Sequence, residues 1–323
     1  MYNKIIGIIY GGYSSENYIS KLSCNNIFNV LRKNYKNLFK VQISQKKWVA
    51  YDKEDISYSI NKKEFSFVIN SKLTKFDLVI NMIHGSPGED GEFARYLNKL
   101  NVVHNSLSPN IAKLTQNKFD CNKKAKRIGI HTPENIKLKN INDLKSIFDK
   151  VKFPCFVKPN SGGSSLGISK VTKIKDLESA VNTAFKEDNI ILIEEYIEGR
   201  EFSVGVIEWE NKIKILPITE IKTKNTFFDY EAKYSGKSEE ITPAKISKNL
   251  QNQLESEILK IYKRFNLKGI VRCEFIVRNN IAYLLDINNI PGMTQESIIP
   301  KQLKIAEISL IHYFNSIIQK HLK

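Results

Sequence analysis

Two apolar runs, each ending at a glycine, constrain the fold of this chain more than any other feature of its sequence. Residues 4–10 are almost entirely apolar and lead into Gly11-Gly12, and residues 76–82 lead to His84-Gly85. A helix is expected between them, from about Tyr18 to Lys33. Strands that alternate with helices are typical of a parallel sheet. Because ligands of such sheets gather where strands end, both glycine turns are candidate binding sites.

The rest of the chain predicts further helices and strands. In the clearest helix, residues 176–187, apolar side chains recur at the i, i+3, i+4, i+7 spacing of one buried face. Two more helices are expected over 117–128 and 249–265, and another ends the chain. Strands are expected over 154–158, 190–194, 201–208, 212–217, 270–277 and 281–288. The polar segment 222–243 is predicted to be a long loop, which is usually functional or disordered.

Composition excludes several classes of protein. At 323 residues the chain is long enough for two or three domains, and 41% hydrophobic with 26% charged residues excludes a collagen-like or wholly disordered protein. The four cysteines form no CxxC pair and no zinc-ligand spacing, which predicts reduced thiols in a cytoplasmic protein. No apolar run approaches the ~20 residues of a membrane helix, so we expect no membrane association.

The net charge of +16 raises the question of a nucleic-acid partner. The 50 lysines and arginines are spread along the whole chain and are not gathered in one arm. A lysine-rich surface explains this pattern more simply, so we expect no nucleic-acid partner. A weaker functional interpretation is that positive potential attracts small anionic substrates.

Two segments suit the binding of a nucleotide. Lys158-Pro159 follows a predicted strand and leads into residues 160–167, which are rich in glycine and serine. Glycines let backbone N–H groups turn toward an anion, and lysine adds a positive charge, so this loop fits a phosphate; a flexible surface turn is the alternative. The second segment, residues 194–201, joins two strands and carries acids that suit an adenine edge and ribose hydroxyls, or a solvated turn.

A third segment predicts a metal site. Side chains alternate along a strand, so Arg272 shares a face with Glu274, and Asp286 shares a face with Asn288. Carboxylate and amide oxygens are ligands that magnesium takes together with substrate phosphates. The alternative is that Arg272 or another base neutralises the two acids.

The turn of this hairpin decides whether the two acids face the same way. In a regular ladder they share a face only if the loop has an odd number of residues, which 278–280 would supply. A two-residue turn, Asn279-Asn280, would place them on opposite faces. We therefore predict the three-residue loop.

Seven ordered motifs, taken together, resemble those of a known family. They are Gly11-Gly12-x-Ser14-x-Glu16, His84-Gly85-x-x-Gly88-Glu89-Asp90-Gly91, Asn117-Lys118, Lys158-Pro159 with its loop, Tyr230-Glu231-Ala232-Lys233-Tyr234, Arg272-x-Glu274, and Asp286-x-Asn288-x-x-Pro291-Gly292-Met293-Thr294. They span nearly the whole chain and look like those of the D-alanine–D-alanine ligases, which are ATP-grasp enzymes. The resemblance implies an α/β (α+β) fold with three-domain ATP-grasp architecture. An N-terminal parallel α/β domain would span 1–104, and central and C-terminal subdomains (105–197 and 198–323) would clamp ATP between antiparallel sheets.

The resemblance also implies ATP-dependent ligation of two D-alanines, through an acyl phosphate, into a dipeptide for peptidoglycan. The implied cofactors are ATP and two Mg²⁺ ions, with Mn²⁺ as a substitute, and the implied assembly is a homodimer. Phosphoryl transfer needs charge neutralisation and alignment, which accounts for the residue types. The residues implied to bind ATP are Lys118, Lys158, Gly163, Ser165, Glu194, Ile197, Glu201 and Lys233, and those implied to bind metal are Glu274, Asp286 and Asn288.

The same resemblance implies a site for the two amino acids. Glu16 would bind the ammonium of the first D-alanine beside His84. Ser164 and Tyr234 would orient Glu16. Arg272 and the Gly292 N–H would stabilise the oxyanion of the tetrahedral intermediate, and Ser297 would hold the carboxylate of the second D-alanine. The acids Glu89 and Asp90 are left out of the site, because acids suit the start of a helix.

The chain departs from the family pattern at several positions. Glu274 stands where Asp is usual, Asp286 where Glu is usual, and Gly162 and Phe228 replace a usual Glu and Tyr. Two alternatives stay open: a related ligase with D-serine or D-lactate as second substrate, and a non-catalytic nucleotide-binding protein. Tyr234 favours an amine nucleophile, and the intact charged residues argue against a loss of catalysis.

Overall fold

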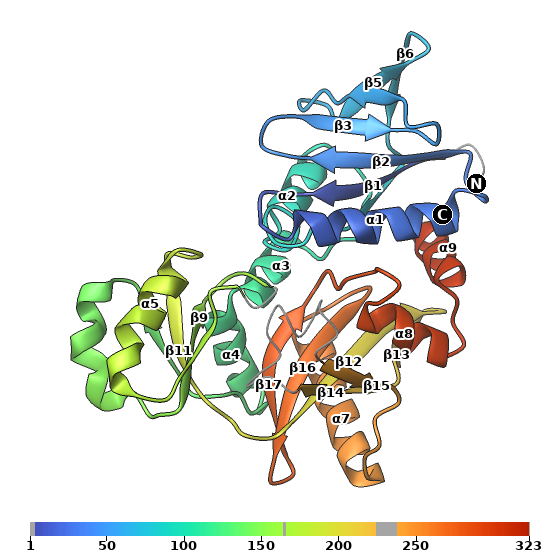
Figure 1. The fold of residues 1–323 in the computed structure, drawn as a ribbon. Coiled ribbons are helices and arrows are strands. Elements are labelled where there is room, and N and C mark those ends of the chain that lie inside the picture. Colours follow the sequence, from blue (N-terminus) through green and yellow to red (C-terminus); the bar gives the residue numbers. More distant parts are fainter. Residues whose placement is uncertain (1–3, 164–165, 224–237, 323) are drawn as a thin grey trace.

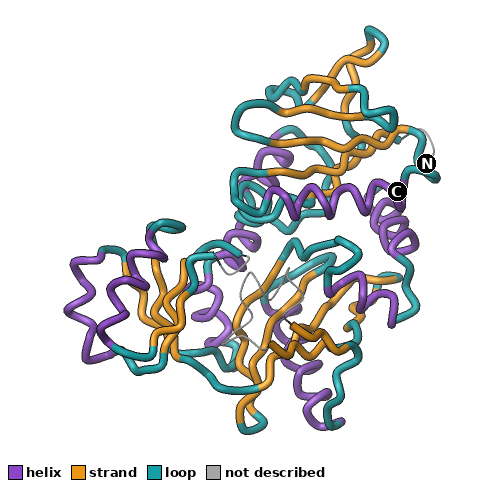
Figure 2. The backbone as a smooth tube through the Cα atoms, viewed as in Figure 1, coloured by secondary structure: helices purple, strands orange, loops and turns teal. Residues whose placement is uncertain are grey.

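Three sheets, each in its own part of the molecule, organise the chain (Figure 1). The computed structural model describes residues 4–163, 166–223 and 238–322. The N-terminal sheet lies at the top of Figure 1, the four-stranded sheet at the left, and the six-stranded sheet at the lower right. Helices accompany all three sheets, as the tube drawing shows (Figure 2). The α/β class expected from the sequence is confirmed.

The N-terminal sheet has the strand order β4-β3-β2-β1-β7. Strand β1 (Ile5–Gly11) pairs in parallel with β2 (Asn37–Ile43) and β7 (Leu78–Asn81), and α1 (Asn17–Leu31) connects β1 to β2. The apolar runs thus form the parallel strands that they predict. Beyond β2 the sheet continues antiparallel through β3 (Trp48–Tyr51) and β4 (Ser57–Ser59), so it is mixed and not wholly parallel.

A small hairpin and a helix complete the N-terminal lobe. The hairpin pairs β5 (Ser66–Ile69) with β6 (Lys72–Lys75), and α2 (Glu92–Lys99) follows β7. Helix α3 (Pro109–Gln116) then leads to α4 (Lys118–Arg127), whose first turn is capped by the Asn117 side chain accepting the Asp120 N–H. The sequence predicts α4 but not α3, although a proline in the first turn is a helix-start signal.

The central sheet is antiparallel throughout. Its order is β10-β9-β11-β8. The strands are β8 (Asn135–Leu138), β9 (Cys155–Pro159), β10 (Ser169–Val171) and β11 (Ile191–Glu195). Helix α5 (Leu177–Phe185) and the 3-10 segments η1 (Ile141–Lys150) and η2 (Ile174–Asp176) accompany it, and the predicted apolar stripe of α5 is buried.

The C-terminal sheet is also antiparallel. Its order is β15-β14-β12-β16-β17, and β13 pairs with β12. The strands are β12 (Arg200–Trp209), β13 (Lys212–Ile215), β14 (Thr219–Thr223), β15 (Ser238–Ile241), β16 (Val271–Arg278) and β17 (Ile281–Asn288). The helices are α7 (Lys248–Arg264), α8 (Ile298–Ile305) and α9 (Leu310–His321). The segment predicted as one long loop over 222–243 therefore has strands at both ends, and residues 224–237 lie outside the described part of the chain.

The prediction of an odd-numbered turn between β16 and β17 is wrong. Arg278 pairs with Ile281, so the turn is Asn279-Asn280, and both asparagines have positive φ. The register shifts between Glu274 and Phe275, because Leu285 is an extra residue on β17. This β-bulge restores the alignment that the two-residue turn would lose. Glu274 lies directly opposite Asp286 after all.

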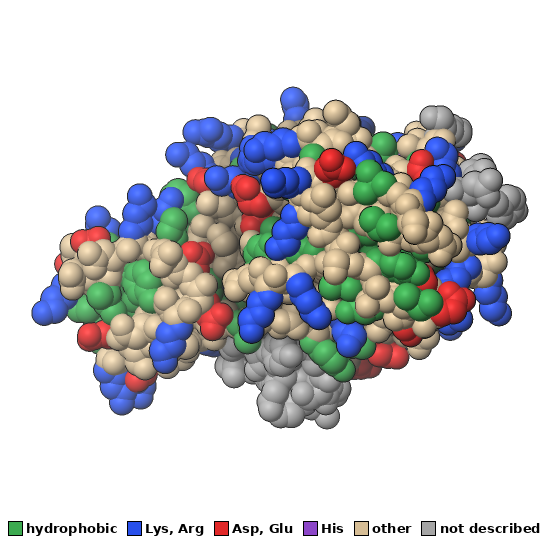
Figure 3. Space-filling view, turned by 90° about the horizontal axis from the view of Figure 1, so that it is seen from above, with side chains coloured by type: hydrophobic (Ala, Val, Ile, Leu, Met, Phe, Trp, Pro, Cys, Tyr) green, Lys and Arg blue, Asp and Glu red, His purple; other side chains and the backbone are tan. Residues whose placement is uncertain are grey.

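The charged surface agrees with a lysine-rich protein. On the face seen in Figure 3, Lys and Arg side chains are spread over the surface among acidic, polar and apolar ones. Among the residues that the structure describes, no helix has the length and apolar character needed to cross a membrane.

Candidate active site

Every described residue that the sequence assigns to the site lines one or both of two adjoining cavities. The first, of about 170 Å³, is lined by Glu16, His84, Arg272, Asn288, Gly292 and Ser297 among others. The second, of about 560 Å³, lies between the central and C-terminal sheets and is lined by Lys158, Glu194, Ile197 and Glu201 among others. Five residues line both cavities: Lys118, Gly162, Gly163, Glu274 and Asp286. A molecule in one cavity would therefore meet a molecule in the other at these five residues.

Lys118 carries a positive charge at this meeting point. Its ammonium donates to the Gly162 carbonyl at 2.7 Å and lies 3.7 Å from Asp286 Oδ2. Burial by itself would lower the pKa of Lys118, but the surrounding carboxylates, Asp286 first, outweigh burial and raise the pKa. The ammonium is therefore charged at neutral pH and faces the space that both cavities share.

The Glu16 carboxylate lies between two glycines from different parts of the chain. A Cβ at Gly163 would lie 2.9 Å from both carboxylate oxygens, and a Cβ at Gly85 would lie 3.5 Å from Oε2. Gly163 belongs to the loop after β9, and Gly85 follows β7. Only a residue without a side chain allows this loop to pass so close to the carboxylate. Glu16 thus lies where the first cavity meets the glycine-rich loop after β9.

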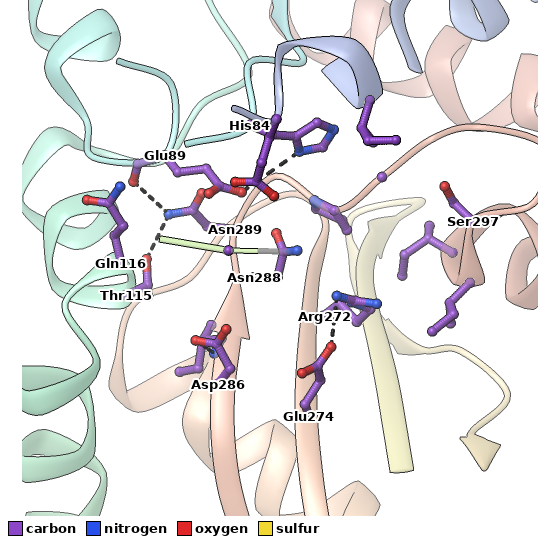
Figure 4. A pocket seen from close by; sticks show the side chains of 18 of the residues that line it. His84, Glu89, Thr115, Gln116, Arg272, Glu274, Asp286, Asn288, Asn289 and Ser297 are labelled. Atoms are coloured by element: carbon purple, nitrogen blue, oxygen red, sulfur yellow. Dashed lines mark hydrogen bonds and ion pairs between the residues drawn. The ribbon is translucent and has the colours of Figure 1, made fainter. Parts of the chain in front are cut away.

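Glu89 belongs to the site, which corrects its assignment to a helix start. Helix α2 begins only at Glu92, and Asp90 serves its first turn by accepting the Glu92 N–H at 2.9 Å. Glu89 instead turns inward: its Oε2 accepts the Gly85 N–H at 3.0 Å, and its Oε1 lies 3.9 Å from His84 Nδ1 (Figure 4). The sequence Glu89-Asp90 does not show which acid faces the cavity and which faces the helix, because the local turn of the backbone decides where each side chain points.

Strand β16 presents Arg272 and Glu274 to the first cavity, as the alternation of side chains predicts. Cys273, the residue between them, is buried on the opposite side of the sheet. Arg272 Nη2 lies 2.9 Å from Glu274 Oε1 (Figure 4). The Arg272 Nε is buried and makes no hydrogen bond to the described residues. The guanidinium therefore retains a donor for a bound group.

The acids and Asn288 have the donor chemistry of a magnesium site. Cross-strand pairing places Glu274 opposite Asp286 and Arg272 opposite Asn288. Within the described residues, no cluster of three or more His, Cys, Asp and Glu side chains could hold a metal ion. Two carboxylates and one amide oxygen still fit Mg²⁺, because that ion keeps several waters and takes substrate phosphate oxygens. Arg272 and Lys118 lie beside the acids, so the alternative interpretation from the sequence, in which bases neutralise them, is seen in the structure, and the metal site stays a prediction.

Gly292 and Ser297 stand together at one end of the first cavity. A Cβ at Gly292 would lie 2.8 Å from Ser297 Oγ. That hydroxyl accepts the Thr294 N–H at 3.1 Å and lies 2.8 Å from Thr294 Oγ1, so its position is set by the same loop. Asn289 ties this segment to the N-terminal lobe: its Nδ2 donates to the Glu89 carbonyl at 3.1 Å and to Thr115 Oγ1 at 2.8 Å (Figure 4).

The second cavity combines a buried ion pair with aromatic walls. Lys158 Nζ donates to Glu194 Oε1 at 2.5 Å, and both side chains are buried. The other carboxylate oxygen, Glu194 Oε2, is buried without a partner among the described residues. Phe156 and Tyr196 pack together in the wall, with ring centroids 5.7 Å apart. Neither ring was predicted from the sequence, although Phe156 on β9 lies two positions before Lys158, and Tyr196, just after β11, lies two positions after Glu194.

Four predicted site residues lie outside the described part of the chain. They are Ser164, Ser165, Lys233 and Tyr234. Their assigned roles stay predictions.

The family described as "D-ala D-ala ligase N-terminus" matches residues 5–106, and "D-ala D-ala ligase C-terminus" matches residues 126–319. The D-alanine–D-alanine ligase of Flavobacterium johnsoniae is 44% identical over 321 residues, which cover 99% of each chain. Among solved structures, the D-Ala:D-Ser ligase VanG of Enterococcus faecalis has a TM-score of 0.84 at 25% identity, covering 98% of this chain and 99% of its own. The Bacillus anthracis D-alanine–D-alanine ligase complexed with ATP has a TM-score of 0.78 at 28% identity, covering 99% and 97%.

Proposed function

The chain belongs to the D-alanine–D-alanine ligase family, and from that premise we propose how its residues join two D-alanines with ATP. The dipeptide product would enter peptidoglycan synthesis. The observation that carries the proposal is the set of five residues common to both cavities. A nucleotide in the second cavity would present its terminal phosphate to an amino acid in the first.

In the first step, the carboxylate of the first D-alanine attacks the γ-phosphate of ATP, which yields an acyl phosphate and ADP. Lys118 and Lys158 contact the phosphates, and their charges favour the transfer. Glu194 and the Ile197 backbone hold adenine, and Glu201 holds the ribose. Support for the adenine contact comes from Glu194 Oε2, an acceptor that is buried without a partner in the described structure.

Glu274, Asp286 and Asn288 would hold two Mg²⁺ ions, which neutralise phosphate charge when they are bound. The support is the donor set alone: two opposed carboxylates and an amide oxygen on neighbouring strands. The exchange of acid lengths relative to the family leaves both charges in place.

In the second step, the amine of the second D-alanine attacks the acyl carbonyl, and phosphate leaves. Arg272 and the Gly292 N–H stabilise the negative charge that develops on the carbonyl oxygen. Glu16 and His84 hold the first D-alanine, and Ser297 holds the carboxylate of the second. We retain the predicted roles of Ser164 and Tyr234 in orienting Glu16, of Gly163 and Ser165 in covering the phosphates, and of Lys233 at the γ-phosphate.

The assay for this function measures ADP release with ATP and magnesium, separately with D-alanine, L-alanine, D-serine and D-lactate, and identifies the products by mass. We expect D-alanyl-D-alanine and release that depends on D-alanine. Asp286→Asn should lower the rate at least about 100-fold, because a carboxylate at the phosphates is lost. Asp77→Asn, which breaks an ion pair with Lys4 at 3.0 Å far from both cavities, is the matched control. A mixed product with D-serine, or no dipeptide, would contradict the substrate assignment.

We also propose that the enzyme is a cytoplasmic homodimer without nucleic-acid or membrane partners. Four buried cysteines, none in a disulfide, support a reducing compartment. The dimer rests on the family resemblance and is tested by light scattering during gel filtration. A mass of one chain, 37.2 kDa, at assay concentration would contradict it.

A further inference from the structure

Two side chains of α1 hold the backbone of Met293, at the far end of the chain. The Met293 N–H donates to Ser23 Oγ at 3.0 Å, and the Met293 carbonyl accepts from Asn26 Nδ2 at 2.7 Å. Ser23 and Met293 are both fully buried. Buried polar groups with such partners are held firmly, because the loss of a partner leaves a desolvated donor or acceptor.

Ser23 also contacts the wall of the substrate cavity. Its Oγ lies 3.4 Å from Nε2 of His84, which lines that cavity. A hydroxyl has one hydrogen and two lone pairs, so Ser23 Oγ can accept the Met293 N–H and still make a hydrogen bond with His84 Nε2, whose tautomer sets the direction of that bond. On the other side of the ring, His84 Nδ1 lies 3.9 Å from Glu89 Oε1. One hydroxyl thus connects the histidine to the Met293 backbone.

We propose that Ser23 is a positioning residue for the acyl-transfer step, an inference that rests on the function proposed above. The peptide group between Gly292 and Met293 is planar, so holding the Met293 N–H also holds the Gly292 carbonyl in its plane. Gly292 supplies the N–H assigned to the oxyanion, and it lies against Ser297. The Gly292 N–H belongs to the preceding peptide group, so Ser23 restrains it through the Gly292 Cα and not by a direct contact. Ser23 in this way limits where the oxyanion donor can lie relative to His84 and the first D-alanine.

This role predicts a defect in one of the two chemical steps. Phosphoryl transfer depends on Lys118 and Lys158, whereas the attack of the amine builds negative charge on the oxygen that faces the Gly292 N–H. With that donor misplaced, the acyl phosphate persists, and water cleaves it to D-alanine and phosphate. The measurable signature is more than one ADP released for each dipeptide formed.

The test compares Ser23→Ala with Ser20→Ala, a matched control one turn earlier on α1. Ser20 is equally buried, but its partners are the Gly11 N–H at 2.9 Å and the Met82 carbonyl at 2.6 Å, both in the N-terminal lobe. In Ser23→Ala we expect dipeptide formation to slow about tenfold and the ratio of ADP to dipeptide to rise severalfold. In Ser20→Ala the ratio should stay at one. A normal ratio in Ser23→Ala, or the same rise in both variants, would overturn the proposal.

Two further variants keep the test decisive if Ser23→Ala does not fold. Asn26 is half-buried, and Asn26→Ala removes its hydrogen bond to the Met293 carbonyl. We expect a smaller rise in the same ratio. Ser23→Thr retains the hydroxyl and should bring the ratio back toward one; a ratio that stays high, or an unchanged ratio in Asn26→Ala, counts against the proposal. If the wild-type protein forms no dipeptide, the proposed function is wrong. If the wild-type protein forms dipeptide and Ser23→Ala has a normal ratio, only the role of Ser23 is wrong.

Discussion

One hydrophobic cluster, the shared core, contains residues of both the N- and the C-terminal lobes, in addition to a cluster in each of those lobes, whereas the cluster of the central sheet contains residues of that part alone. Ile27 of α1 and Leu38 of β2 belong to the same buried cluster as Met293 and Phe314 from the other end of the chain. The buried members of the central core all lie between residues 138 and 193. Because the two ends of the chain pack together, we expect the N- and C-terminal lobes to move as one unit. The central sheet lies between them in sequence and packs as a separate unit.

This difference indicates how the two halves of the site behave. The link from the central sheet to α4 is made of hydrogen bonds: Asn160 accepts the Lys118 and Phe119 N–H groups at 3.0 Å, and Gly162 accepts the Lys118 ammonium. Local opening is least costly where few apolar contacts are lost. We therefore expect the central sheet to move over the second cavity, while the first cavity, whose lining comes mostly from the N- and C-terminal lobes, changes less.

The largest expected effect comes from the central sheet, at Lys158. Lys158→Met removes a phosphate contact and leaves the Glu194 carboxylate buried without its 2.5 Å partner. We expect ADP release to fall at least about 100-fold, and the central sheet to lose about 3–5 kcal/mol of stability. The ADP assay measures the rate, calorimetry of thermal unfolding measures the stability, and calorimetric titration measures ATP binding. Lys152→Met, an exposed position just before β9, is the control, and ATP binding equal to wild type in Lys158→Met would refute this role.

Next in size are two matched truncations that separate the cores. Ile27→Ala and Leu177→Ala each remove a fully buried aliphatic side chain, at a cost of about 2–5 kcal/mol. Leu177→Ala should speed hydrogen exchange in β8–β11 alone, whereas Ile27→Ala should speed it in α1 and α9 together. Exchange followed by mass spectrometry makes the comparison. If Leu177→Ala sped exchange throughout the molecule, the two cores would not be independent.

The smallest effect is a difference in thiol reactivity in the unmutated protein. Burial raises the pKa of Cys155 in the central core to about 11, and it raises the pKa of Cys24 in the shared core further. At pH 8 both thiols are protonated in the folded state, so alkylation waits for local opening, where the pKa falls back to its ordinary range. We expect iodoacetamide to label Cys155 before Cys24, and ATP to slow Cys155 only. Equal rates at the two sites would argue for one cooperative unit.

Local patterns predicted much of this molecule because they depend on neighbours along the chain. The alternation over 271–278 placed Arg272 and Glu274 on one face, and the apolar stripe of 176–187 became the buried side of α5. Asn117 begins α4 as a cap. The ordered motifs added the family, which matches the chain over both of its parts.

The errors arose where a local pattern has two structural outcomes. The two-residue turn at Asn279-Asn280 should have separated the acids, and the bulge at Leu285 brought them back together. Glu89 and Asp90 are adjacent acids, yet Asp90 accepts the N–H of the first residue of α2, whereas Glu89 lines the first cavity. A bulge and a turn are chosen by the packing of the whole sheet and lobe, to which the local residues contribute only part of the energy.

The sequence by itself determined β1, β7, the strands of the β16–β17 hairpin, the helix α5 and the family, since each depends on residue type and short spacing. Only the tertiary structure decided that Lys158 pairs with Glu194, that Glu16 lies against Gly163, and that Ser23 holds Met293 from 270 residues away. Those contacts form between segments that are brought together by a shared core. Their geometry follows from how that core packs, which no stretch of the chain specifies alone.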